Sequence, residues 1–256
     1  SLRVAEALEE GPSPELLVIN HASNVTGAIQ DLGSIVPLCK KRGTRVLVDC
    51  AQTAGRVDLT ELGADAYVLP GHKGLMGPPG VGALCLDGAP ELLALIEGGT
   101  GSSRATDRMP EELPASLEAG TPNTPGYYGW HAGLNWLQEQ DPAKLHAREL
   151  SLLGSLGERL AGLEEEGAVR CFGGTGERHV AILSLSFRDF DPVEVAVILE
   201  QHEIIARAGF HCAPYVHRAL GTGESGTLRL SPGPFNTEEQ IAAVGDVLLQ
   251  VLKSGH

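Results

Sequence analysis

The chain has 256 residues, of which 42% are hydrophobic, with 33 Gly and 16 Pro. That length and apolar content suit one large or two modest globular domains with a real core. The formal net charge of −14 argues against nucleic acid and against an anionic membrane as partners. No apolar run approaches the roughly 20 residues of a membrane span, and the first residues do not resemble a signal peptide.

The cysteines are odd in number, scattered along the chain and not arranged as CxxC pairs; they are Cys39, Cys50, Cys85, Cys171 and Cys212. Such a set is too sparse for a disulfide framework, and it lacks the spacing of a structural zinc site. We therefore expect free thiols, no metal and a reducing, cytoplasmic location.

The first half of the chain alternates short apolar runs with helical patterns. The expected strands are Leu16–Asn20, Arg45–Asp49, 66–69 and, reversed after a Gly/Pro-rich turn, Gly82–Leu86; the expected helices are 31–42, ended by Gly43, and a short piece at 59–62. This order predicts an α/β fold with a mainly parallel, doubly wound sheet. Ligands of such sheets bind at the carboxyl ends of the strands.

The second half begins with an aromatic helix over 126–140, and Pro142 marks a domain junction. The elements expected after it are a helix at 143–166, a strand at 179–187, a helix at 192–202, strands at 204–209 and 226–232, and a helix at 237–253. We accordingly expect a large domain over residues 1–140 and a smaller C-terminal α/β domain over 141–256.

Four polar residues follow two neighbouring strands of the predicted large domain. Asp49 and Gln52 end one strand, and His72 and Lys73 come after the next. A partly buried lysine amine can form a Schiff base with a carbonyl, and pyridoxal phosphate (PLP) offers such a carbonyl. Its pyridine nitrogen needs a carboxylate partner, for which Asp49 is suited. Taken alone, each of these residues could be a helix cap or a solvated surface side chain. The spacing of all four along the chain favours a PLP site.

At this point the sequence resembles the class V aminotransferases, which are fold-type I PLP enzymes, and among them the cysteine desulfurases and selenocysteine lyases. The segments that carry the resemblance, in the order of the family, are NHASNVTG (20–27), VLVDCAQTAG (46–55), ADAYVLPGHKGLMGPPGVG (64–82), GGTGS (98–102), EAGTPN (118–123), RAGFHCAP (207–214) and TLRLS (227–231). They extend over nearly the whole chain and are highly specific as a set.

The resemblance implies a role for each candidate cofactor residue. Lys73 would carry PLP as a Schiff base, Asp49 would face the pyridine nitrogen, and Gln52 would bind the ring hydroxyl. His72 would bind the phosphate or relay protons. Family members are usually dimers, in which Thr100 would reach the phosphate held by the other subunit.

The resemblance also implies a substrate site and a nucleophile. Asn24 and Arg229 would hold the amino-acid substrate, and Arg207 would lie with them. Cys212 would attack the sulfur of L-cysteine, leaving a persulfide on the enzyme and releasing alanine, and a further protein or small thiol would accept the sulfur. Arg207 and His211 are cations or donors that would lower the pKa of the thiol. Other class V reactions remain open, namely transamination, C–S lysis, epimerisation and selenocysteine cleavage. His211, Cys212 and His217 could also suggest a metal site, but no fourth ligand is evident, so we expect none.

Two departures from the family pattern point to a different alternative. The resemblance implies an N-terminal stretch that includes a phosphate-holding loop and a group stacked on the pyridine ring, and nothing before Leu16 can replace them. Pro70 stands where relatives commonly have Ser or Thr, so one phosphate donor is lost. The first feature favours a truncated or split chain, and the two together support the alternative of a cofactor-poor, non-catalytic fragment.

Overall fold

The computed structural model describes residues 2–88, 91–99, 101 and 108–254. The chain forms two compact units. The first consists of Ser1–Ile19, Leu32–Ala54 and Leu59–Glu139; the second consists of Asn20–Asp31, Gly55–Asp58 and Gln140–His256. Two short segments of the first half thus belong to the second unit, which no sequence pattern indicated. The domain division at residue 140 stays a prediction.

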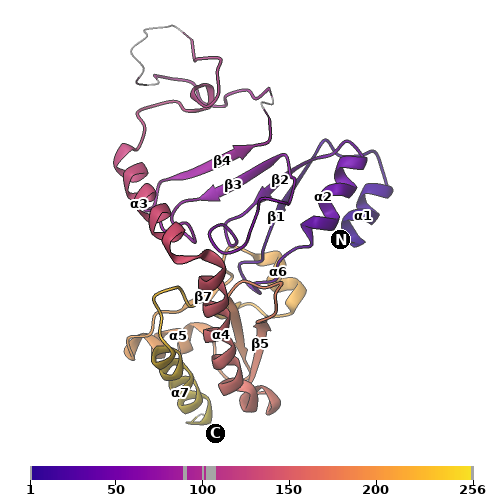
Figure 1. Ribbon diagram of the computed structural model, residues 1–256. Coiled ribbons are helices and arrows are strands. Elements are labelled where there is room, and N and C mark those ends of the chain that lie inside the picture. The colour runs from indigo at the N-terminus through magenta and orange to yellow at the C-terminus, as the bar shows by residue number, and fades with distance from the viewer. Residues whose placement is uncertain (1, 89–90, 100, 102–107, 255–256) are drawn as a thin grey trace. The chain divides into compact units, whose positions relative to one another are not determined.

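The first unit contains a four-stranded sheet with the order β1-β2-β3-β4 (Figure 1). The strands are β1 (Leu16–Asn20), β2 (Arg45–Asp49), β3 (Ala66–Pro70) and β4 (Gly82–Leu86). β2 and β3 are parallel, while β4 runs antiparallel to β3, as the reversal after the Gly/Pro-rich turn predicted. Apolar runs of four or five residues therefore predicted all four strands.

The helical elements of this unit are α1 (Leu2–Glu9), α2 (Leu32–Lys41), the 3-10 turn η1 (Ala115–Leu117) and α3 (Thr124–Gln140). α1 and α2 lie next to each other (Figure 1), and their apolar side chains share a core with Val46 and Val48 of β2. The short helix expected at 59–62 is wrong. That segment is a turn ending at Gly63, whose φ is +63°, because so few residues do not sustain helical hydrogen bonding.

The face of the sheet opposite that core carries a row of residues from three strands. Asp49 is in register with Val68, and Val68 is in register with Leu84. Val68 and Leu84 are exposed, whereas Val48 is fully buried. Asp49 therefore projects from the more accessible side of the sheet, since neighbours in register share a face.

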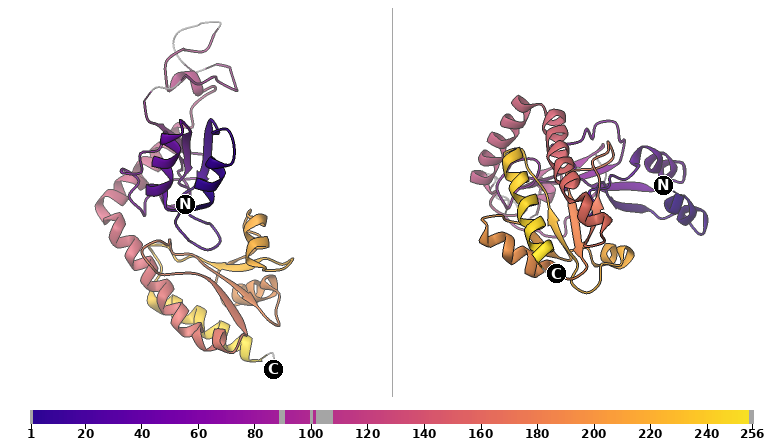
Figure 2. Two further views of the ribbon diagram at one scale, coloured as in Figure 1. Left: turned by 90° about the vertical axis from the view of Figure 1, so that its right-hand side faces the viewer. Right: turned by 90° about the horizontal axis from the view of Figure 1, so that it is seen from below.

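The second unit has an antiparallel sheet with the order β5-β6-β8-β7. Its strands are β5 (Val169–Gly173), β6 (Leu183–Phe187), β7 (Arg207–Gly209) and β8 (Thr227–Leu230), and its helices are α4 (Pro142–Glu165), α5 (Pro192–Gln201), α6 (Pro214–Leu220) and α7 (Glu238–Ser254). α4 and α7 run side by side (Figure 2), and leucines of α4 form the core with the sheet, α5 and α7. None of the described helices is long and apolar enough to cross a membrane.

Candidate functional site

Lys73 lies in a tight loop that follows β3. The Gly77 N–H donates to the Gly71 carbonyl at 2.7 Å, and the Met76 N–H donates to the Lys73 carbonyl at 3.0 Å. His72 and Lys73 are both exposed, although the sequence reasoning expected a partly buried amine. The loop therefore presents the amine at the carboxyl end of β3, at the sheet edge where ligands bind.

Helix α3 packs closely against this loop, and glycines make the approach possible. A Cβ on Gly77 would come within 2.6 Å of Trp130, and one on Gly71 would come within 3.2 Å of the same indole. A Cβ on Gly133 of α3 would lie 2.4 Å from the Met76 carbonyl oxygen. Real Cβ atoms essentially never approach to 2.4 or 2.6 Å, and 3.2 Å is already tight, so the glycines and Trp130 determine how the Lys73 loop is held. Sequence reasoning did not identify this supporting role of Trp130 and Gly133.

Asp49 and Gln52 follow the neighbouring strand β2. Asp49 ends β2 in register with Val68, and its Oδ1 accepts the Ala51 N–H at 2.8 Å. Gln52 is half-buried on the turn that comes next. The structure thus places four of the five predicted cofactor residues at the ends of adjacent parallel strands or directly after them. Thr100 lies outside the described residues.

A second cluster, in the second unit, collects the other candidate residues. Arg207 of β7 is directly opposite Arg229 of β8, so the two guanidinium groups share a face. Arg229 donates from Nη1 to the Asn24 carbonyl at 2.9 Å, and Asn24 donates from Nδ2 to the His211 carbonyl at 2.5 Å. Cys212 follows His211 and is exposed. Residues that are more than 180 positions apart in sequence thus meet in one hydrogen-bonded chain, a contact that no local sequence pattern can reveal.

The charges of this cluster differ from the sequence-based expectation in one respect. Burial, helped by Arg229, lowers the pKa of His211 to about 4, so its imidazole is neutral near neutral pH. Of the two roles expected of His211 beside the thiol, a cation or a donor, its imidazole can therefore fill only that of a donor near neutral pH. Its Nε2 lies 3.0 Å from the Thr227 carbonyl, which can only accept, so Nε2 carries the proton. Burial and Arg207 lower the pKa of Arg229, and the charge of Cys212 opposes that shift.

Comparison with known proteins identifies the family. The model of the family described as Aminotransferase class-V matches residues 3–244. The chain belongs to the class V aminotransferase family. A probable cysteine desulfurase of Methanothermobacter thermautotrophicus is 32% identical over 99% of this chain and 64% of its own length. Cysteine desulfurase CsdA of Escherichia coli is 31% identical over 94% of this chain and 60% of its own length.

Solved structures confirm the predicted fold class. The apo cysteine desulfurase of Thermococcus onnurineus superposes with a TM-score of 0.85 at 31% identity, covering 98% of this chain and 63% of that one. The S-sulfonic acid form of CsdA from Escherichia coli gives a TM-score of 0.84 at 30% identity, covering 97% and 62%. This class V chain therefore spans less than two thirds of the length of the relatives that it matches.

The residues of this class V chain fit PLP, the cofactor of the family. The set offers a carboxylate, an amide, an imidazole and a primary amine at adjacent strand ends, the groups that the ring and its aldehyde require. In the second unit the Nε of Arg229 is buried without a hydrogen-bond partner. A buried guanidinium edge of this kind fits an anionic ligand group such as a carboxylate.

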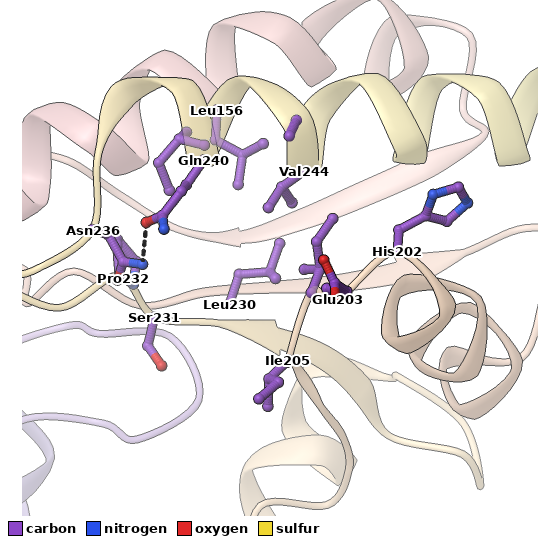
Figure 3. A pocket seen from close by; sticks show the side chains of 13 residues that line it. Leu156, His202, Glu203, Ile205, Leu230, Ser231, Pro232, Asn236, Gln240 and Val244 are labelled. Carbon is purple, nitrogen blue, oxygen red and sulfur yellow. Dashed lines mark hydrogen bonds between the residues drawn. The ribbon is translucent and has the colours of Figure 1, made fainter.

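Two further observations bear on other kinds of site in this class V chain. His211 bonds Thr227 and His217 Nδ1 bonds Thr222 Oγ1 at 2.8 Å, and within the described ranges no group of three or more potential ligands could hold a metal. A cavity of about 400 Å³ lies in the second unit (Figure 3), lined by residues of α4, β8, α7 and the segment around Ile205. It contains none of the predicted site residues, so it does not contribute to the candidate site.

Proposed function

We propose that this protein is a PLP-dependent cysteine desulfurase, which removes sulfur from L-cysteine, releases alanine and keeps the sulfur as a persulfide on Cys212. The observation that carries the proposal is an exposed cysteine on a tight turn, in the cluster that contains Arg207 and Arg229. Two relatives at about 30% identity that are named cysteine desulfurases support the same reaction.

The first unit would hold the cofactor. Lys73 would attach PLP and later move protons at the substrate carbon, while Asp49 would keep the pyridine nitrogen protonated. Gln52 would donate to the ring hydroxyl, and His72 would bind the phosphate or relay protons. Bound PLP supplies an electron sink that weakens bonds at the substrate carbons.

The second unit would hold and cleave the substrate. Arg229, with a free buried Nε, would bind the carboxylate, and Asn24 and Arg207 would complete the site. The Cys212 thiolate would attack the substrate sulfur. The carbon–sulfur bond then breaks, the carbon takes up a proton to become alanine, and the thiol of Cys212 becomes a persulfide.

The proposal extends to partners and location. We infer a homodimer, because in the enzymes that this chain resembles the residue matching Thr100 reaches the phosphate held by the other subunit. We also infer a protein or small-thiol acceptor that removes the persulfide sulfur. All five cysteines are free, two of them buried, which supports a reducing compartment such as the cytoplasm. Selenocysteine is the alternative substrate, since both amino acids present the same carboxylate and a nucleophile-sensitive chalcogen.

Replacement of Cys212 tests the proposal. The chain is loaded with PLP and given L-cysteine with a reductant, and sulfide release is measured for Cys212→Ser and for Cys85→Ser, which removes another exposed thiol. We expect release to be lost in the first variant and kept in the second. Undiminished release by Cys212→Ser would mean that the nucleophile is wrong. A chain that retains no cofactor after borohydride reduction would contradict the PLP assignment.

A further inference from the structure

Cys212 is held in a backbone conformation that its residue type does not favour. The Ala213 N–H donates to the Phe210 carbonyl at 2.8 Å, which closes a four-residue turn. The two central residues, His211 and Cys212, have φ angles of +50° and +61°. Turns with two positive φ angles normally carry Asn or Gly there, because other side chains crowd the backbone. Contacts outside the turn must therefore hold Cys212 in place.

One of these contacts acts on the peptide group directly before Cys212. The carbonyl of that peptide belongs to His211, and it accepts from Asn24 Nδ2 at 2.5 Å. A hydrogen bond to a peptide carbonyl restrains the orientation of the peptide plane, and that plane sets φ of the next residue. Asn24 thus restrains the direction in which the Cys212 side chain leaves the backbone.

Asn24 is itself firmly placed. Its carbonyl accepts from Arg229 Nη1 at 2.9 Å, and the next carbonyl, of Val25, accepts from the buried Ser184 hydroxyl at 2.6 Å. A Cβ on Gly27 would lie 2.5 Å from the Val180 carbonyl oxygen, so the segment packs tightly against its neighbours. Asn24 can therefore transmit a restraint from the strands of the sheet to the turn.

We propose that Asn24 is a positioning residue for the thiol of Cys212, linking that thiol to Arg229 through its own carbonyl and amide. This role is different from the substrate contact that the family resemblance implies. It rests on the proposed function only in that the thiol of Cys212 is there the nucleophile. The same guanidinium that would bind the substrate carboxylate anchors Asn24, so substrate binding at Arg229 and the orientation of Cys212 are coupled.

Thiol alkylation tests the proposal without cofactor or substrate. The full chain, in a Cys85→Ser background, is treated with iodoacetamide, and modification of Cys212 is followed by mass spectrometry. Asn24→Ala and Asn24→Asp both remove the N–H donor, and Asp keeps the side-chain shape. We expect alkylation to slow about fivefold, the effect of one lost hydrogen bond on the population of the held turn, because the released turn no longer holds the thiol in its exposed position.

The control is Asn236→Ala, which removes a turn-closing asparagine elsewhere in the same unit and should leave the rate unchanged. An unchanged rate in either folded Asn24 variant would overturn the proposal. In the unaltered chain, backbone chemical shifts that give a negative φ at Cys212 would overturn it as well. Sulfide release by Cys212→Ser bears on the proposed function alone, so the two ideas can fail separately.

Discussion

Replacing Arg56 by Met should destabilise the second unit severely. Arg56 Nε and Glu149 Oε2 form an ion pair at 2.7 Å, and only 9% and 5% of the two side chains are exposed. The Met variant leaves the Glu149 carboxylate buried without its cation, and removal of one partner from such a pair costs about 3–5 kcal/mol. We expect the free energy of unfolding of this unit, measured by urea titration, to fall by that amount near neutral pH.

The loss of stability in Arg56→Met should depend on pH in a defined direction. Burial raises the pKa of Glu149, and Arg56 opposes this rise. A carboxyl whose pKa is raised on folding favours the native state at low pH, and that contribution is lost as the pH increases through the folded pKa. Without Arg56 the pKa rises further. The destabilisation should therefore be larger at about pH 8 than at about pH 5.

Two further variants separate the ion pair from other effects. Arg56→Met combined with Glu149→Leu should recover most of the stability, because an apolar pair of similar volume replaces a buried ion pair at little cost. Lys144, on the same helix as Glu149, pairs with Asp141 at 3.3 Å, and its side chain is 82% exposed. Lys144→Met should therefore change the free energy of unfolding little. Equal losses for Arg56→Met and Lys144→Met would refute the reasoning.

Other predictions concern the cofactor loop and the Cys212 turn. Lys73→Ala should abolish borohydride trapping of PLP, while Lys41→Ala, at an exposed helical position, should not. If peptide mapping finds PLP trapped on another lysine of Lys73→Ala, the assignment of Lys73 is contradicted. Gly133→Ala should destabilise the first unit by about 1–3 kcal/mol and weaken trapping, since its Cβ would meet a carbonyl at 2.4 Å. Gly129→Ala on the same helix, with its nearest contact at 3.4 Å, should be neutral or stabilising. The pKa of His211 is lowered on folding, from 6.5 to about 4, so native stability should decline as the pH falls from 6.5 to about 4. His211→Asn should flatten this decline, measured as urea midpoints against pH. An unchanged dependence of the midpoint on pH would contradict the prediction.

Much of the fold could be predicted because its elements have strong local patterns. Apolar runs of four or five residues predicted all four strands of the first sheet, and Pro142 and Pro192 stand at helix starts as their fixed φ favours. β5 and α6 were not predicted. The buried residues of β5 are Val169 and Phe172, three positions apart, so the strand lacks the alternation of a half-buried strand, and α6 is seven residues long and has no side-chain cap.

The candidate site was predictable only in part, for a physical reason. Asp49 and Lys73 follow strands that are neighbours in sequence, so local order was sufficient to bring them to one sheet edge. The link from Arg229 through Asn24 to His211 depends on tertiary packing across most of the chain. The left-handed turn at Cys212 was equally hidden, because the His-Cys pair contains none of the Gly, Asn or Asp residues that normally mark such turns.

The central claim is that Cys212 receives the sulfur of L-cysteine. The most direct measurement is mass spectrometry of the chain after loading with PLP and incubation with L-cysteine in the absence of reductant. We expect one added sulfur on the peptide that contains Cys212, and alanine formed in equal amount. Alanine formed without sulfur on Cys212, or sulfur found only on the exposed Cys85, would contradict it.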